Sequence, residues 1–146
     1  IACGIARTVK NFGYDPKVAL LSFSNFGNPS GIKSEIIKNS VSLLSERNVD
    51  FEFDGEMSAE TALDYNLIKE NYPFCRLSGP ANVLIMPDLS SANISFQLLQ
   101  KLGGGNVLGP IMIGGEQSFQ IVQMGASVTE IIDAAAIATY NAIEKK

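Results

Sequence analysis

The sequence predicts an α/β fold in three layers, α/β/α, built around a mostly parallel sheet. Short apolar runs typical of buried strands alternate with amphipathic runs of helical period along almost the whole chain. The order of a strand followed by a helix is repeated four times, and this order places parallel strands between helices on both faces. A composition of 46% hydrophobic and 18% charged residues supplies a sizeable core.

Four runs are expected to form the strands. Residues 18–24 (VALLSFS) and residues 82–87 (NVLIMP) are mostly apolar, as strands buried on both faces are. Residues 51–53 are a shorter strand that ends in the turn Asp54-Gly55-Glu56. Residues 107–113 are also strand-like, although Pro110 favours an edge or an irregular position.

The helices are bounded by recognisable start and stop signals. A first helix ends at Asp15-Pro16, and the next presents apolar residues on one face, namely Ile37, Val41 and Leu44. Ser58 caps a helix that runs to about residue 70. Residues 92–102 are helical and are terminated by the three glycines 103–105. Residues 127–130 (SVTE) form a capping box that opens a final helix.

Length and charge restrict the classes of protein to which the chain can belong. Its 146 residues fit one domain, and its beginning reads as the middle of a helix, which predicts a fragment of a longer protein. The net charge is −4 and no basic run is present, so nucleic-acid binding is not expected. The longest apolar runs are too short to cross a membrane and no signal peptide is seen, so we expect a cytoplasmic protein.

The titratable residues exclude several kinds of catalytic centre. The chain has no histidine, which excludes Ser-His and Cys-His nucleophile pairs and histidine-ligated zinc within it. Cys3 and Cys75 have neither a metal-binding nor a redox spacing. The carboxylates Asp54, Glu56 and Asp88 follow strands and could hold a metal, but solvated or helix-capping carboxylates are commoner. We therefore predict no metal site.

Polar loops at the carboxyl ends of the expected strands predict a ligand cleft. These loops are residues 24–31, residues 54–56 and Pro87-Asp88. The first of them joins a buried strand to a helix, so its amides can face a phosphate or a carboxylate, but it can equally be a plain connection. The glycines 103–105 follow a helix and precede a strand, which is the opposite order to that of a phosphate-binding loop.

Five stretches resemble, in sequence order, the phosphate acetyl/butyryltransferase (phosphotransacetylase) family. They are VALLSFSN at 18–25, FDGEM at 53–57, ANVLIMPDL at 81–89, SANI at 91–94 and LGPI at 108–111. The resemblance implies two α/β lobes of the isocitrate/isopropylmalate dehydrogenase type, of which residues 1–146 are the second lobe and the C-terminal helix. It further implies acyl transfer between coenzyme A and phosphate in a cleft between the lobes, and a homodimer or higher homo-oligomer.

The sequence departs from this family where the family's chemistry is carried. Active members typically read KPVNDLSRG, whereas this chain reads QSFQIVQMG at 117–125. The phosphate-binding serine is thereby matched by Gln123, the neighbouring arginine by Met124 and a catalytic aspartate by Glu130. A second arginine is matched by Lys101, which keeps the charge but loses the bidentate geometry. Loss of such an electrostatic contact typically costs about 2–4 kcal/mol in the transition state. We therefore expect little acetyltransferase activity and assign no catalytic residue.

This degenerate pattern, together with LSFSNFG at 21–27, is most similar to the C-terminal phosphotransacetylase-like domain of bacterial NADP-dependent malic enzymes. The resemblance implies a regulatory module that binds acetyl-CoA or a related acyl-CoA, joined in cis to catalytic domains. Those domains convert malate and NADP to pyruvate, CO₂ and NADPH, and NADP and Mg²⁺ or Mn²⁺ would belong to them. Two alternatives stay open: a divergent phosphate acyltransferase that uses Lys101 and Glu130, and a purely structural oligomerisation domain.

The residues expected to bind the ligand come from the loop, the turn, one helix and the degenerate segment. They are Ser24, Asn25, Phe26, Gly27, Asn28, Asp54, Gly55, Glu56, Lys101 and Gln123.

Overall fold

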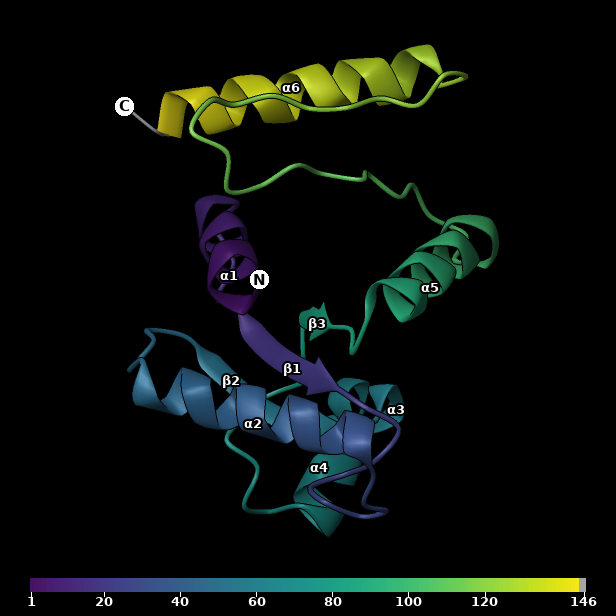
Figure 1. Ribbon diagram of the computed structural model, residues 1–146. Helices are drawn as coiled ribbons and strands as arrows, with labels where there is room; N and C mark the ends of the chain where they lie inside the picture. Colours follow the sequence, from purple (N-terminus) through teal and green to yellow (C-terminus); the bar gives the residue numbers. More distant parts are fainter. Residues whose placement is uncertain (145–146) are drawn as a thin grey trace. The chain divides into compact units, whose positions relative to one another are not determined.

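The computed structural model describes the backbone of residues 1–144 (Figure 1). The chain forms two compact units, Ile1–Ile94 and Ser95–Lys146. Among the described residues, no helix combines the length and the apolar character that a membrane span needs.

The first unit contains a parallel sheet of three strands in the order β2-β1-β3 (Figure 1). The strands are β1 (Lys17–Leu21), β2 (Glu52–Met57) and β3 (Val83–Ile85). The prediction of an α/β fold with a mostly parallel sheet is confirmed. Strands β1 and β3 are shorter than expected, because the ladder ends at Leu21 and Ile85 and the chain turns away from the sheet there.

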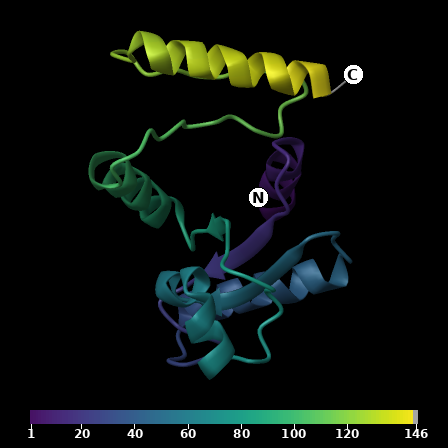
Figure 2. The ribbon, with the colours of Figure 1, turned by 180° about the vertical axis from the view of Figure 1, so that it is seen from behind.

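Helices cover both faces of this sheet, which gives the three layers. Val18 and Leu20 of β1 pack into one cluster with α1 (Ala2–Asn11) and α2 (Ile32–Glu46). The alternate residues Ala19 and Leu21 pack into a second cluster with α3 (Ala59–Leu63). Helix α2 lies in front of the sheet in Figure 1 and behind it in Figure 2.

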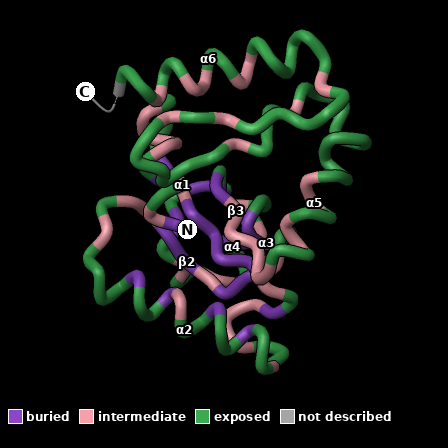
Figure 3. Tube along the Cα trace, turned by 45° about the horizontal axis from the view of Figure 1, so that its top comes forward, coloured by how far each residue is buried: buried purple, intermediate pink, exposed green. Residues whose placement is uncertain are grey.

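Helix α2 follows the predicted apolar period. Ile37, Val41 and Leu44 are buried against the sheet, and their spacing places them on one face of the helix. Figure 3 shows the buried residues gathered on the strands and along one side of α2. Burial of such side chains typically stabilises a fold by about 1.5–3 kcal/mol each.

The helix expected from Ser58 to residue 70 is broken in two. Ser58 caps α3 as predicted, by accepting a hydrogen bond from the Thr61 N–H at 3.1 Å. Asp64 then leaves the helical conformation, and its carboxylate accepts hydrogen bonds from the first N–H groups of α4 (Tyr65–Asn71) at 2.9 and 3.1 Å. An aspartate that caps a new helix competes with continuation of the old one, and here the cap prevails.

Asp54, Gly55 and Glu56 lie inside β2, so the prediction of a turn after residue 53 is wrong. Leu20 pairs with Gly55 and Leu21 with Met57, which leaves Glu56 as an extra residue on β2. Such a bulge lets a strand continue while it re-aims a side chain. Gly55 permits it because its φ is +150° and a Cβ atom there would lie 2.6 Å from the Leu20 carbonyl oxygen.

Helix α5 (Leu89–Leu102) begins and ends with local signals. The Asp88 carboxylate accepts a hydrogen bond from the Ser91 N–H at 2.8 Å, and this cap starts the helix three residues earlier than predicted. Gly103 ends it, as expected, with a hydrogen bond to the Leu99 carbonyl at 2.9 Å.

The strand predicted at residues 107–113 does not form. Gly109 adopts a φ of +137° and Pro110 has no N–H to donate, so this stretch lacks the regular donors of a ladder. Met112 instead exchanges two hydrogen bonds with the Gln120 side chain, at 2.8 and 3.1 Å. The final helix α6 (Val128–Glu144) begins at the predicted capping box.

Replacing Gly55 by alanine should destabilise the first unit by about 2–4 kcal/mol, because alanine strains a left-handed backbone and its methyl group collides with β1. Urea denaturation of the full chain measures this change. Gly13→Ala is the matched control, since its φ is +84° but nothing lies within 4 Å of the added atom. Its cost should be about 1 kcal/mol. Equal costs for the two variants would contradict the assigned close approach.

Candidate functional site

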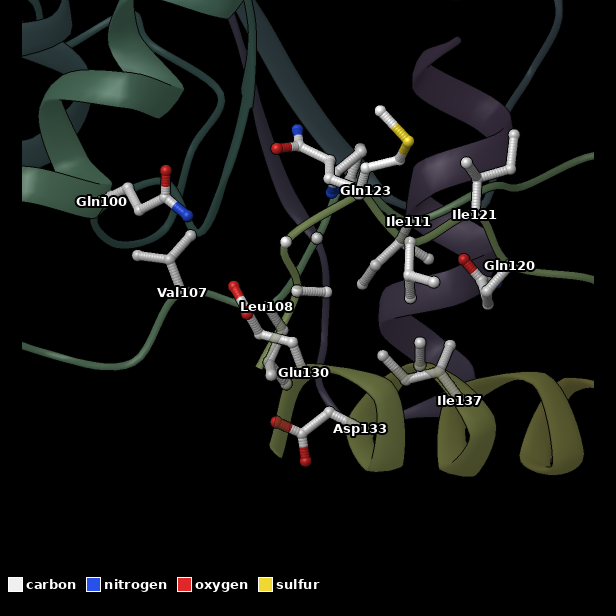
Figure 4. A pocket seen from close by; sticks show the side chains of 17 residues that line it. Gln100, Val107, Leu108, Ile111, Gln120, Ile121, Gln123, Glu130, Asp133 and Ile137 are labelled. Atoms are coloured by element: carbon white, nitrogen blue, oxygen red, sulfur yellow. The ribbon is translucent and has the colours of Figure 1, made fainter. Parts of the chain in front are cut away.

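A cavity of about 270 Å³ lies within the second unit (Figure 4). Its walls are residues 107–111, residues 120–126 and the first turns of α6, with Gln100 of α5. The first two of these segments are extended and are joined by the two hydrogen bonds between Met112 and the Gln120 side chain. Together with α6 they enclose the cavity. Predicted site residues from the degenerate segment therefore lie together with residues that the sequence analysis did not single out.

Three predicted positions line this cavity, namely Gln123, Met124 and Glu130. The Met124 side chain is fully exposed to solvent, so this residue contributes to the rim and not to the interior. Lys101 is not among the lining residues; hydrogen bonds from Ser127 are the main cause that lowers the pKa of Glu130, and the positive charge of Lys101 adds to them. Of the predicted positions, Gln123 thus supplies an amide and Glu130 a carboxylate to the cavity, and neither supplies a cation.

Glu130 is engaged in the capping box of α6. Its carboxylate accepts hydrogen bonds from the Ser127 N–H at 2.6 Å and the Ser127 hydroxyl at 2.8 Å, and its own N–H donates to the Ser127 Oγ at 3.3 Å. The Ser127 N–H bond, then the hydroxyl bond, hold the pKa of Glu130 below its usual value. A carboxylate that is already bonded and has a lowered pKa is a weak general base near neutral pH.

The lining combines apolar walls with polar groups that carry no positive charge. Glu130 and Asp133 place two carboxylates there, and no lysine or arginine is among the lining residues that the structure describes. Gln100, Gln120 and Gln123 add three amides, of which Gln120 is fixed by its two bonds to Met112. The cavity can surround an apolar chain and accept N–H or O–H donors, but it cannot neutralise an anion.

The predicted loop residues of the first unit are brought together around Glu56. Ser24 and Glu56 are 0% and 1% exposed, and the Ser24 hydroxyl donates to Glu56 Oε1 at 3.0 Å. The Gly27 N–H donates to the same oxygen. Asn25 accepts a hydrogen bond from the Ser58 N–H at 2.8 Å. The polar groups of these residues therefore hydrogen-bond to one another, and these bonds hold the loop at the carboxyl end of β1.

Backbone bonds and aromatic contacts complete this loop. Asn25 and Asn28 exchange N–H to carbonyl bonds at 3.0 and 3.1 Å. Phe26 donates its N–H to the Glu56 carbonyl at 2.8 Å, and its ring lies 5.2 Å from that of Tyr72 and 4.9 Å from that of Phe74. The Phe26 side chain is therefore a partner in an aromatic cluster.

Asp54 is separate from that loop and serves an ion pair. Its carboxylate accepts from the Arg76 guanidinium at 3.0 Å and from the Arg76 N–H at 2.7 Å. The guanidinium carbon also lies 4.5 Å from the centroid of the Phe53 ring. Sequence reasoning did not identify Arg76, because no local pattern connects it to a carboxylate twenty-two residues earlier.

Asp88 also has local partners. Besides capping α5 it pairs with Lys33 at 3.2 Å, and the Ser91 N–H is the first cause that lowers the pKa of Asp88 to about 2. Among the described residues, no group of three or more Cys, Asp or Glu side chains is placed to hold a metal ion.

The predicted ligand residues fall in both units. Eight of them lie in the first unit: Ser24, Asn25, Phe26, Gly27, Asn28, Asp54, Gly55 and Glu56. Lys101 and Gln123 lie in the second. Asp133, which lines the cavity, was missed, although it follows Glu130 by three residues and therefore shares its helix face.

Comparison with known proteins identifies the family. Residues 1–139 match the family described as phosphate acetyl/butaryl transferase. The chain is 51% identical over 142 residues to the NADP-dependent malic enzyme of Rhizobium meliloti (strain 1021), with 97% of this chain and 18% of that protein covered. It is 36% identical over 140 residues to the phosphate acetyltransferase of Treponema pallidum (strain Nichols), with 94% and 42% covered.

A solved structure agrees with these matches. A phosphotransacetylase from Streptococcus pyogenes superposes with a TM-score of 0.91 and 31% sequence identity, with 98% of this chain and 44% of that chain covered. The chain thus spans less than half the length of each of these relatives. From the match over residues 1–139 and the shared fold, this chain belongs to the phosphate acetyl/butaryl transferase family.

Proposed function

We propose that this chain is the phosphotransacetylase-like, acetyl-CoA-binding regulatory region of a bacterial NADP-dependent malic enzyme, with little acetyltransferase activity of its own. The malic enzymes of Rhizobium meliloti and Rickettsia prowazekii share 51% and 44% identity with it, against 36% for the phosphate acetyltransferase of Treponema pallidum. These identities support the malic enzyme assignment, and the expected loss of acetyl transfer is supported by the charge of the cavity, which has two carboxylates and no cation among its described lining residues.

A phosphate substrate is disfavoured by this lining. Two unit charges of the same sign at about 4 Å repel by roughly 1 kcal/mol in water and about 4 kcal/mol near a protein surface. Family chemistry would need a cation to offset the phosphate, and the exposed Met124 offers none. The carboxylate of Glu130, the remaining candidate base, already accepts two hydrogen bonds from Ser127 at the start of α6. Acetyl transfer to phosphate therefore lacks both its anion site and its proton acceptor.

Malate oxidation is assigned to domains outside this chain. The described residues offer no metal-binding cluster, and the sequence carries no dinucleotide-binding fingerprint, so they do not fit NADP or Mg²⁺. In the proposed enzyme, which would be cytoplasmic, this region binds acetyl-CoA and self-associates as a homodimer or higher oligomer. Regulation requires that acetyl-CoA bind one arrangement of the whole enzyme more tightly than another.

A divergent phosphate acyltransferase is the second candidate. The likeness to phosphate acetyltransferases and the positive charge of Lys101 near Glu130 favour it. It differs from the first candidate in one measurable product, acetyl phosphate.

Titration of acetyl-CoA into the full-length protein, with malate oxidation assayed in the same buffer, tests the proposal. We expect saturable binding and a change in malate turnover, without formation of acetyl phosphate. Formation of acetyl phosphate would favour the acyltransferase. If no heat of binding is seen at millimolar acetyl-CoA, the regulatory proposal fails and a purely structural oligomerisation role becomes the better account.

The double variant Gln123→Ser with Met124→Arg restores the residue types of the family's phosphate site. We expect it to stay without measurable transfer, because one arginine offsets only one of two carboxylates and Glu130 still caps α6. Coupled assay of acetyl phosphate from acetyl-CoA and phosphate measures this. Val128→Arg is the matched control, since Val128 is 74% exposed and outside the lining. Clear transfer by the double variant alone would show that the remaining site is intact.

A further inference from the structure

We propose that a separate cavity, in the first unit, binds a short-chain monocarboxylate, with Arg7 as the residue that holds its charge. The cavity has a volume of about 320 Å³. It lies between α1 and residues 48–51, which lead into β2, and so beside the amino end of that strand. The inference goes beyond the proposed function, since none of the residues expected to bind acetyl-CoA lines this cavity.

Local structure places the two walls of the cavity side by side. Cys3, Arg7 and Lys10 are spaced by four and three residues, so they share one face of α1. The other wall begins at Asn48, which follows α2 and has a φ of +48°, a left-handed conformation that asparagine tolerates at a helix end. Residues 49–51 then run beside α1.

The floor of the cavity is apolar. Cys3, Val49 and Phe51 are partly buried and pack against the core of the first unit. The Phe51 ring also makes an edge-to-face contact with Phe53, with 6.0 Å between the ring centroids. A short alkyl chain that enters this space leaves water and contacts these side chains, which favours its binding.

The rim of the cavity carries one uncompensated positive charge. Arg7 is exposed and makes no hydrogen bond or ion pair with any described residue. Lys10 is already paired: its ammonium lies 2.6 Å from a carboxylate oxygen of Asp50 and donates to the Asp50 carbonyl oxygen at 2.8 Å. The described lining therefore has two cations and one carboxylate, and the unpaired cation is the Arg7 guanidinium.

This arrangement fits a ligand with one negative charge and a short apolar body. A guanidinium can bind a carboxylate through two parallel N–H bonds, and such charge-assisted bonds are the stronger kind. A doubly charged anion finds no second free cation among the described lining residues, because Asp50 neutralises Lys10. An uncharged ligand contacts the floor and leaves the guanidinium unused. A monocarboxylate of a few carbon atoms uses both.

Titration of butyrate into the full-length protein, followed by NMR of the ligand, tests the inference. Butyramide is the uncharged probe of the same shape. We expect saturable binding of butyrate at millimolar concentration and weaker binding of butyramide. Arg7→Gln should weaken butyrate binding roughly tenfold, as expected for loss of charge-assisted hydrogen bonds. Arg47→Gln is the matched control, because Arg47 is exposed in the same unit and lies outside the lining.

A second variant should increase binding, which a misfolded protein cannot imitate. Asp50→Asn removes the carboxylate that neutralises Lys10, so the lining gains a second uncompensated positive charge and butyrate should bind several-fold more tightly. The Asp50 side chain is 86% exposed, so loss of its ion pair should leave the melting temperature nearly unchanged.

Equal affinities for butyrate and butyramide, or equal effects of Arg7→Gln and Arg47→Gln, would overturn the inference. Weaker butyrate binding by Asp50→Asn would overturn it too. Domains outside this chain can also bind a carboxylate, so only the butyrate signal that Arg7→Gln removes counts as binding to this cavity. A signal that none of the three variants changes counts against the inference.

Discussion

The burial of strand β1 on both faces is the constraint on which the first unit depends. Val18, Ala19, Leu20 and Leu21 are at most 4% exposed, and they alternate between two clusters that contain α1 and α2 on one side and α3 on the other. Both neighbouring strands pair with β1, so the ladder and the packing fix its position together. Because β1 is fixed by pairing and by packing, the position of its carboxyl end is fixed too, and so is the start of the loop that follows it.

At the carboxyl end of β1, hydrogen bonds join the β-bulge of β2 to the loop that follows β1. Because β2 carries one more residue than β1 at Glu56, this side chain leaves the regular alternation and meets Ser24 and Gly27. Glu56 in the first unit and Glu130 in the second therefore share a property. Each is a carboxylate that sequence resemblance associates with a ligand site, and each is bonded to hydroxyl and amide donors of its own chain.

The sequence was sufficient to predict those elements that depend only on residues close together in the chain. The apolar strand β1, the period of α2 and the capping box of α6 were predicted because each depends on residues close together in the chain. Predictions were wrong where the local structure depends on residues that are distant in sequence. Strand β2 continues through Gly55 because Gly55 pairs with Leu20 of β1. Residues 107–113 form no strand because they have no strand partner among the described residues. Asp64 was a local signal that was overlooked. The pairing of Asp54 with Arg76 carries no pattern that a single sequence reveals.

The capping role of Glu130 also limits how this chain can evolve. If the Glu130 carboxylate were freed to take part in proton transfer, it would no longer accept its two hydrogen bonds from Ser127. Those bonds cap the start of α6, a helix of seventeen residues. Selection for chemistry and selection for an intact helix start would then favour different residues at one site. A lineage that had lost acyl transfer in this way would need a second, compensating cap before it could regain it, so the loss would be difficult to reverse by single steps.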